Sequence, residues 1–399
     1  MPAAPRSRPR GLHARRTLVC ACLVVLATAI LGGCDDGRDP QPEARRSSES
    51  KAEVTTRLPK RPPAPVHRTD VYAADRPGRL SPVVRGFRRL IYVPNSDSGT
   101  VDEIDPRTYK VVRHFAVGAL PQHVVPSYDL KTLWVTNDLG NTLTPIDPRN
   151  GRPGKPVPVL DPYNLYYTPD GRFAVVMAER LKRIDFRDPH TMELRHTLSV
   201  PNCAGVNHAD YTADGRYMLV SCEFAGRMIV VDVRRQRVVK TIPLRAGAKP
   251  QDVKLSPRGG LFYVADMISG GVWKLDAHKF RKRGFVATGR GAHGLYPSRD
   301  SRYLYVSNRD EGSVSVLAFP TGKVERTWRL PAGGSPDMGG VSADGRTLWL
   351  SGRYNGVVYA IDTRNGRLKR QIAVGSGPHG LCVYPQPGRY SLGHTGVFR

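Results

Sequence analysis

Residues 303–317 read YLYVSNRDEGSVSVL, which is two short alternating apolar runs on either side of a polar turn, RDEG at 309–312. Alternation of β-branched and aromatic residues around a Gly-containing turn is typical of a β-hairpin. A second turn, FPTG at 319–322, leads into a third run over 323–330, and a fourth run lies near 338–342. This stretch therefore predicts a unit of four short strands.

The same unit occurs seven times along the chain. Its first apolar run starts at Ile91, Leu133, Ala174, Met218, Phe262, Leu304 and Leu348. These starts are separated by 42, 41, 44, 44, 42 and 44 residues. Four strands repeated every 40 to 45 residues or so are typical of a propeller blade, and no 12-residue window keeps a helical period. We therefore expect an all-β fold, a seven-bladed β-propeller of four-stranded blades.

The phase of the repeat predicts how the ring closes. The first unit begins on its second strand at residue 91, whereas the last unit ends with a first strand over 380–384. We expect this C-terminal run to be the innermost strand of the first blade. It would tie residues near 90 to residues near 383 and so protect the sheet edges at the two ends of the array.

Composition excludes several other classes of protein. The chain has 399 residues, a formal charge of +26, 40% hydrophobic residues, 40 Gly and 34 Pro. It is too apolar for a disordered chain, and six Cys are too few for a disulfide-built miniprotein of this length. The basic residues are scattered, with no aromatic-interleaved basic stripe, so nucleic acid is a weak candidate partner.

Residues 1–33 have the layout of a lipoprotein signal peptide, a basic region followed by a short uncharged one. LGGC at 31–34 resembles a lipobox, in which Cys34 is lipidated and becomes the new N-terminus. Residues 34–80 are rich in Arg, Pro, Ser and Glu and predict a disordered tether, and 81–399 is the expected propeller. We expect a protein lipid-anchored at the extracytoplasmic face of the cell membrane.

Three units share a further motif after the first apolar residue. It reads YVPN at 92–95, WVTN at 134–137 and YVSN at 305–308, and PHG at 378–380 precedes the last strand. These motifs resemble the YVTN-repeat, YncE-like bacterial β-propellers over about residues 90–385. The resemblance implies the fold. It says little about function, because relatives of this shape include d1-haem proteins, amine dehydrogenase heavy chains, lactonases and ligand-binding surface proteins.

Aligning the units places one polar residue at the mouth of each innermost strand, where we expect the central channel to open. These candidates for a ligand mouth are His123, Asn164, His208, Asp252, His293, Asp337 (or Met338) and His379. Four converging histidines can bind a metal or ligate a haem. A histidine after Pro or Gly is also part of the repeat itself, which favours a structural role. We therefore predict no metal or cofactor, with a metal or haem d1 as the alternative.

The same face is expected to carry Arg309, Arg353 and Tyr354. Mixed charges beside a tyrosine suit a sugar, a carboxylate or a peptide, although solvated loops have the same composition. Cys203 and Cys222 lie near the two ends of one predicted hairpin. A disulfide between them is compatible with an extracytoplasmic location, and the sequence leaves its formation open.

No catalytic nucleophile, metal motif or cofactor motif is recognisable in the sequence. We therefore expect a membrane-anchored scaffold that binds a small molecule or an envelope protein without turning it over. The alternative is an enzyme on the same scaffold, either a metal-dependent, lactonase-like hydrolase or a d1-haem redox protein.

Overall fold

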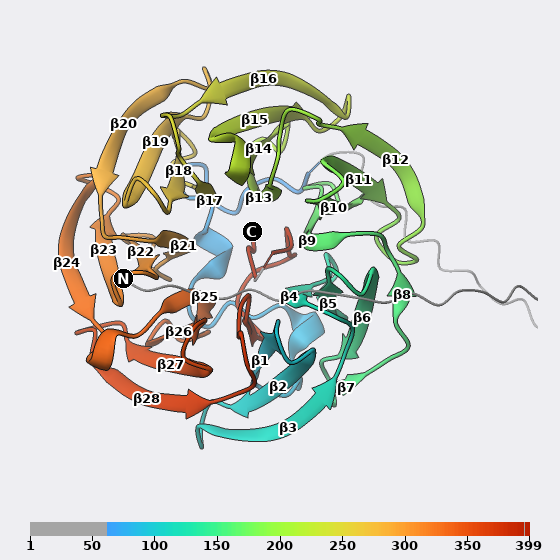
Figure 1. The fold of residues 1–399 in the computed structure, drawn as a ribbon, viewed down its shortest axis with the longest axis vertical. Helices are drawn as coiled ribbons and strands as arrows, with labels where there is room; N and C mark the ends of the chain where they lie inside the picture. The colour runs from blue at the N-terminus through green and yellow to red at the C-terminus, as the bar shows by residue number, and fades with distance from the viewer. Residues whose placement is uncertain (1–61, 395) are drawn as a thin grey trace, which may run out of the picture. The chain divides into compact units, whose positions relative to one another are not determined.

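The computed structural model describes residues 62–394 and 396–399, so the predicted signal peptide, Cys34 and residues 35–61 of the predicted tether lie outside the described range. The described chain forms seven antiparallel sheets that follow one another around a central axis (Figure 1). The predicted all-β, seven-bladed propeller is confirmed. The helices among the described residues are four short 3₁₀ turns, η1 (Ala73–Asp75), η2 (Pro82–Val84), η3 (Glu223–Ala225) and η4 (Pro331–Gly333). None of the described helices is long and apolar enough to span a bilayer.

Blade 1 joins the two ends of the repeat array. From the axis outwards its strands are β29 (Cys382–Tyr384), β1 (Leu90–Asn95), β2 (Thr100–Asp105) and β3 (Lys110–Ala116). Ile91 pairs with Val383, and Tyr92 pairs with Cys382, in antiparallel register. The C-terminal run is therefore the innermost strand of the first blade, as predicted, and the closed ring leaves only short, protected edges.

Blade 2 differs from the others at its rim. Its strands are β4 (Pro121–Pro126), β5 (Leu133–Asn137), β6 (Thr142–Asp147), β7 (Arg152–Pro153) and β8 (Val157–Pro158). The two short pieces, β7 and β8, both pair with β6 and together take the place of one outer strand. Pro153, Pro156 and Pro158 explain the interruption, because proline has no backbone N–H to donate to a neighbouring strand.

Blades 3 to 7 repeat one plan, with an innermost strand at the axis and an outermost strand at the rim. In that order the strands are β9 (Pro162–Tyr167), β10 (Ala174–Ala178), β11 (Arg183–Arg187) and β12 (Leu194–Ser199) in blade 3; β13 (Val206–Tyr211), β14 (Tyr217–Cys222), β15 (Arg227–Asp232) and β16 (Arg237–Pro243) in blade 4; β17 (Pro250–Leu255), β18 (Leu261–Asp266), β19 (Gly271–Asp276) and β20 (Lys282–Ala287) in blade 5; β21 (Ala292–Pro297), β22 (Tyr303–Asn308), β23 (Ser313–Ala318) and β24 (Lys323–Arg329) in blade 6; and β25 (Pro336–Val341), β26 (Thr347–Gly352), β27 (Val357–Asp362) and β28 (Leu368–Ala373) in blade 7.

Apolar side chains of neighbouring blades form the core. Leu219 and Val230 of blade 4, for example, pack in one cluster with Val253 and Phe262 of blade 5. Innermost strands such as β13 are buried along their whole length, whereas β3 at the rim has no buried residue. Each blade therefore buries its apolar face against the next, and this contact holds the ring together.

Segments before β1 and after β29 lie at the end of the channel where the innermost strands finish, here called the covered end. Tyr72 is buried, and its hydroxyl donates to the carbonyl oxygen of Leu255 at 2.6 Å. Leu80 forms an isolated bridge with Pro387. The tether predicted from the sequence reaches residue 80, yet its described part, 62–80, includes a segment that packs against the propeller.

Candidate functional site

Polar side chains fill the axial channel at two levels. The second residue of each innermost strand forms the upper level, which includes His293 and Asp337, with His379 in the equivalent place in blade 1. The third residue forms the lower level, and its polar members are His123, Asn164, His208 and Asp252. In blades 2 to 7 a register shift lies near the start of the innermost strand. Such a bulge changes where consecutive side chains point and so allows two levels.

The predicted mouth residues do come together, but the histidines among them are buried. The ring centroid of His123 lies 4.9 Å from that of His379 and 5.8 Å from that of His208. The ring of His293 lies 5.9 Å from that of His379 and 6.0 Å from that of His208. None of these four residues is more than 3% exposed, so the histidines form a packed cluster inside the channel rather than an open rim.

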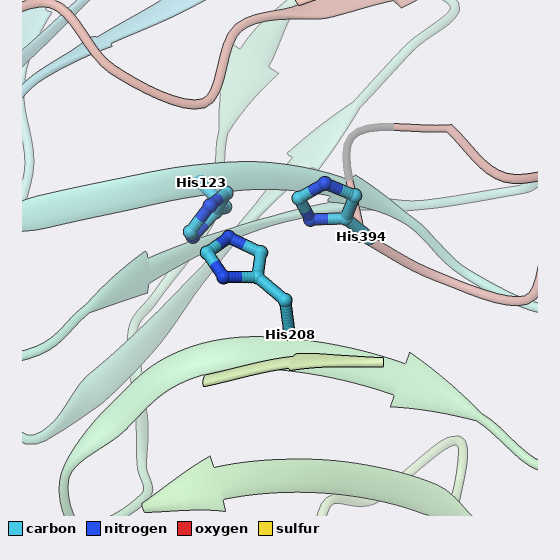
Figure 2. Close-up of side chains that lie close together, drawn as sticks. All are labelled: His123, His208 and His394. Carbon is cyan, nitrogen blue, oxygen red and sulfur yellow. The ribbon is translucent and has the colours of Figure 1, made fainter. Parts of the chain in front are cut away.

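A fifth imidazole, which sequence reasoning missed, belongs to the same cluster. His394 is carried by the segment after β29, and its ring centroid lies 5.2 Å from those of both His123 and His208 (Figure 2). The ring also stacks on Tyr166 at 5.8 Å. His394 has no equivalent in the seven units, because it enters the channel from the covered end.

Burial controls the charge of the cluster. It lowers the pKa of His123, His208 and His379 well below the usual value for an imidazole and also lowers the pKa of His394. Neighbouring imidazoles add to this effect at His123 and His208. These four rings are therefore neutral at pH 7.

Two buried carboxylates keep their charge because cations lie beside them. Burial alone would raise the pKa of Asp252, but Lys254 Nζ lies 2.8 Å from its Oδ1, and the pKa is well below its usual range. Burial acts in the same direction on Asp337, where His293, 3.0 Å away, and Arg309 lower the pKa. Both carboxylates are ionised at pH 7.

Arginines stand over the upper level, at the end of the channel where the innermost strands begin. Arg309 Nη1 lies 3.4 Å from Asp337 Oδ1, and Nη2 lies 2.9 Å from the sulfur of Met267. The Nε of Arg309 is buried and has no hydrogen-bond partner among the described residues. The guanidinium also lies 5.4 Å from the ring centroid of Tyr354, which is 67% exposed.

Arg353 has few partners as well. Its Nη1 lies 3.4 Å from Ser96 Oγ, and its charge helps to lower the pKa of both Asp337 and His379. The predicted set of Arg309, Arg353 and Tyr354 is therefore brought together next to the channel.

Carboxyl groups stand on another side of the same opening. Asn207 Nδ2 donates to Glu223 Oε2 at 2.8 Å and to Glu179 Oε1 at 3.3 Å. Burial, followed by the charges of Glu223 and Asp138, raises the pKa of Glu179 to about 8. Glu179 is therefore protonated at pH 7 and can donate a hydrogen bond. We call Glu179, Glu223, Arg309, Arg353 and Tyr354 the entrance. Glu179 was missed from the sequence because a single Glu at a strand end carries no motif.

A disulfide fixes one edge of the entrance. Cys203 and Cys222 are bonded, with their Cα atoms 4.7 Å apart, and Cys222 directly precedes Glu223. Cys382 is buried in β29 as a free thiol.

Comparisons with known proteins agree on the fold. A family described as YncE-like beta-propeller matches residues 86–387. Dihydro-heme d1 dehydrogenase of Pseudomonas aeruginosa is 28% identical over 229 residues, which is 53% of this chain and 44% of that protein, so the match spans less than half of the relative's length.

Solved structures give the same result. Hydrazine synthase of Kuenenia stuttgartiensis has a TM-score of 0.60 at 18% identity, covering 70% of this chain and 96% of that one. A Desulfotomaculum acetoxidans protein described as functionally unknown has a TM-score of 0.63 at 16% identity, covering 74% and 98%. At such identities the likeness concerns the fold alone.

Proposed function

This chain belongs to the YncE-like β-propeller family, and we propose that it binds a small anionic ligand at the entrance. We further propose that it does so as a lipoprotein anchored in the membrane through Cys34. The observation that carries the proposal is the incomplete set of partners around Arg309 and Arg353. Arg309 lies 3.4 Å from Asp337 and 3.9 Å from Asp310, which are both long contacts. The contact of Arg353 among the described residues is with the hydroxyl of Ser96, at 3.4 Å. A buried guanidinium donor without an acceptor is costly, and a carboxylate or phosphate matches its geometry.

The neighbouring groups indicate which chemical groups the ligand has besides its negative charge. Glu179, protonated at pH 7, and the exposed ring of Tyr354 offer a donor and a stacking surface beside the arginines. The ionised Asp337 beneath them partly offsets the positive charge, so a ligand of one or two negative charges with hydroxyl groups fits better than a polyanion. Sugar acids and small hydroxycarboxylates belong to this class.

Isothermal titration calorimetry of the purified full chain with citrate, gluconate and inorganic phosphate tests the proposal. We expect at least one of these anions to bind. Arg309→Gln and Arg353→Gln should each weaken its affinity tenfold or more, which is about 1.4 kcal/mol. Arg107→Gln is the matched control, because Arg107 is an exposed arginine outside the entrance.

Two results would contradict this proposal. One is the absence of binding by all three anions in the millimolar range. The other is equal binding by the two entrance variants and the control. Hydrolysis of lactones by the purified chain would instead support the lactonase-like alternative and contradict binding without turnover.

Membrane anchoring is tested separately in cells. Cys34→Ala removes the expected acyl acceptor, so the protein should move from the membrane fraction to the soluble fraction. Ser47→Ala, in the expected tether, is the control and should leave the protein in the membrane. Retention of the Cys34→Ala variant in the membrane would contradict lipid anchoring.

A tetrapyrrole is a second candidate ligand, because the relative named dihydro-heme d1 dehydrogenase shares 28% of residues over the matched stretch. The entrance suits the carboxylates of such a macrocycle. The channel does not suit axial ligation, since the five imidazoles are packed against one another and none is more than 3% exposed. Titration with haemin, followed by visible absorption, should therefore show binding that depends on Arg309 without the spectrum of a histidine-ligated haem.

A further inference from the structure

Three imidazoles from three parts of the chain meet in the interior of the channel. His123 comes from β4, His208 from β13 and His394 from the segment that closes the covered end. One ring nitrogen from each lies within 4.8 Å of the other two, and Figure 2 shows the three rings facing one another. We propose that His123, His208 and His394 form a binding site for one divalent transition-metal ion of the zinc type.

Two of the nitrogens have no other role. His123 Nδ1 lies 3.0 Å from the carbonyl oxygen of Tyr163, and His208 Nδ1 lies 3.1 Å from Asn207 Oδ1. Both partners are acceptors, so each Nδ1 carries the proton and each Nε2 keeps its lone pair. Both Nε2 atoms are buried without a hydrogen-bond partner. A buried imidazole lone pair that lacks a donor is what a metal ion satisfies.

The third ring is held in the opposite tautomer. Asn164 Nδ2 donates to His394 Nδ1 at 3.0 Å, and the Oδ1 of the same amide accepts from the backbone N–H of Leu165, which fixes its orientation. His394 Nε2 therefore carries the proton, and it faces Asp252 Oδ1 at 3.6 Å. Metal binding at Nδ1 would displace the amide of Asn164 and leave an Asp252–His394–metal arrangement.

The surroundings match those of known metal sites. A ligating histidine commonly donates its other N–H to a carbonyl or a carboxylate. His123 and His208 have such a partner, and His394 Nε2 lies 3.6 Å from the carboxylate of Asp252. Zinc binds imidazole nitrogen at about 2.0–2.1 Å, so the ion would draw the rings somewhat closer. The imidazoles are neutral at pH 7, and the carboxylate of Asp252, which is paired with Lys254 at 2.8 Å, lies beside His394.

A second group, His293, Asp337 and His379, also brings possible ligands together. It is a poorer cation site, because Arg309 lies 3.4 Å from Asp337, and His293 Nδ1 already lies 3.0 Å from the same carboxylate. These three residues therefore belong with the anion-binding entrance, and the cation site lies beneath it.

The proposed ion would also fix the covered end. His394 is on the segment that follows β29, whereas His123 and His208 are on innermost strands of two blades. An ion bound to all three would tie this segment to the ring, and metal binding to a folded site stabilises the folded state.

Calorimetric titration of the metal-free full chain with Zn²⁺ tests the proposal. We expect one equivalent to bind with submicromolar affinity. His123→Ala, His208→Ala and His394→Asn should each weaken binding a hundredfold or more. His278→Ala is the matched control, because His278 is exposed on an outer turn.

Two further measurements keep the proposal testable if a channel variant fails to fold. X-ray absorption of the zinc-loaded chain should count three imidazole nitrogens at about 2.0–2.1 Å. Hydrogen exchange of residues 390–397 should slow when Zn²⁺ is added.

The proposal would be overturned by a wild-type chain that binds no Zn²⁺ at micromolar concentration. Unchanged affinity in a folded His123→Ala/His208→Ala double variant, or a ligand shell dominated by carboxylates, would also overturn it. Arg309→Gln should leave zinc affinity unchanged, so failure of the anion site and failure of the metal site can be told apart.

Discussion

Two buried arginines mark the two ends of the axial channel, and they differ in how well their charge is matched. The side chains of Arg399 and Arg309 are 9% and 10% exposed. Arg399 Nη2 lies 2.9 Å from Asp210 Oδ1, and its guanidinium lies 4.7 Å from the ring centroid of Tyr72. Arg309 has a carboxylate only at 3.4 Å and a sulfur atom as its nearest acceptor.

The difference teaches which end is structural. At the covered end, Asp210, the partner of Arg399, is itself fixed in place, because it also accepts hydrogen bonds from the backbone N–H groups of Tyr211 and Leu255. At the entrance the carboxylates lie farther from Arg309, with Asp337 at 3.4 Å and Asp310 at 3.9 Å, than Asp210 lies from Arg399 at 2.9 Å. Each guanidinium also keeps one buried nitrogen without a hydrogen-bond partner among the described residues, Nε in Arg309 and Nη1 in Arg399. Equal burial with unequal pairing separates an arginine that stabilises the fold from one that is available to a ligand.

The largest expected effect is the loss of the ion pair at the covered end. Arg399→Met leaves Asp210 buried without its cation, so the free energy of unfolding should fall by about 3–5 kcal/mol. Denaturant unfolding measures it. Arg364→Met is the matched control, because Arg364 pairs with Asp362 at a site where the arginine is 75% exposed, and it should cost less than about 1 kcal/mol. A loss of similar size in both variants would break the comparison.

The disulfide is expected to be a main source of stability at the edge of the entrance. It closes a loop with a sequence separation of 19 residues. In the chain-entropy description, removing a cross-link of this size costs about 3 kcal/mol. The Cys203→Ser/Cys222→Ser double variant should therefore unfold at lower denaturant concentration, and wild-type protein kept in reductant should match it. Equal stability of oxidised and reduced protein would contradict this prediction.

The sequence predicted the ring and its closure because both depend on local patterns repeated seven times. Alternating runs, turn residues and the spacing of the units are all visible without long-range information. The closing strand followed from the phase of the repeat, and its pairing of Ile91 with Val383 is the pairing that the phase required.

The level of each channel residue was harder to predict. His293 and His208 are polar residues near the start of their strands, yet they lie at different levels because they are the second and third residues of those strands. The strand starts hold a signal that the alignment did not use, since Pro162, Pro250 and Pro336 all stand first in innermost strands. Aligning on these prolines places Asp337 at the upper level and Asn164 and Asp252 at the lower level, but it leaves His208 and His293 unplaced, because their strands begin with Val206 and Ala292.

His394 had no such signal. It follows the last strand, outside any unit, and its place in the channel depends on how residues 385–394 fold back over the covered end. Contacts of this kind join residues far apart in sequence, such as Asn164 with His394, and no repeat or spacing encodes them. The hydrogen-bond partners of Arg309 could not be predicted from the sequence either, because they come from several blades.

A smaller effect is expected from the protonated carboxyl of the entrance. Burial, then Glu223 and Asp138, raises the pKa of Glu179 to about 8. Between the pKa of the unfolded chain, about 4.3, and about 8, the folded state keeps a proton that the unfolded state loses, so stability falls as the pH rises. The slope from this one group is at most about 1.4 kcal/mol per pH unit.

Glu179→Gln should therefore flatten the decrease in unfolding free energy between pH 5 and pH 8. Part of the decrease should remain, because burial raises the pKa of Asp75, at the covered end, to about 8 as well. Glu193→Gln is the control, since Glu193 is an exposed surface residue whose side chain is 65% exposed. Identical pH profiles for wild type and Glu179→Gln would contradict the assignment of the proton.

Tyr354→Ala should have the smallest effect on stability. It should also distinguish most clearly between the ligand-binding role of the entrance and the structural role of the covered end. The ring is 67% exposed, so its removal should change the free energy of unfolding by less than about 0.5 kcal/mol. The same ring covers the guanidinium of Arg309 at 5.4 Å, and a cation–π contact of this kind is worth about 0.5–1 kcal/mol at an exposed site. Affinity for the anion that binds the wild type should therefore fall about twofold to fivefold. A variant that loses stability without losing affinity would place Tyr354 with the structural residues and reverse the distinction between the entrance and the covered end.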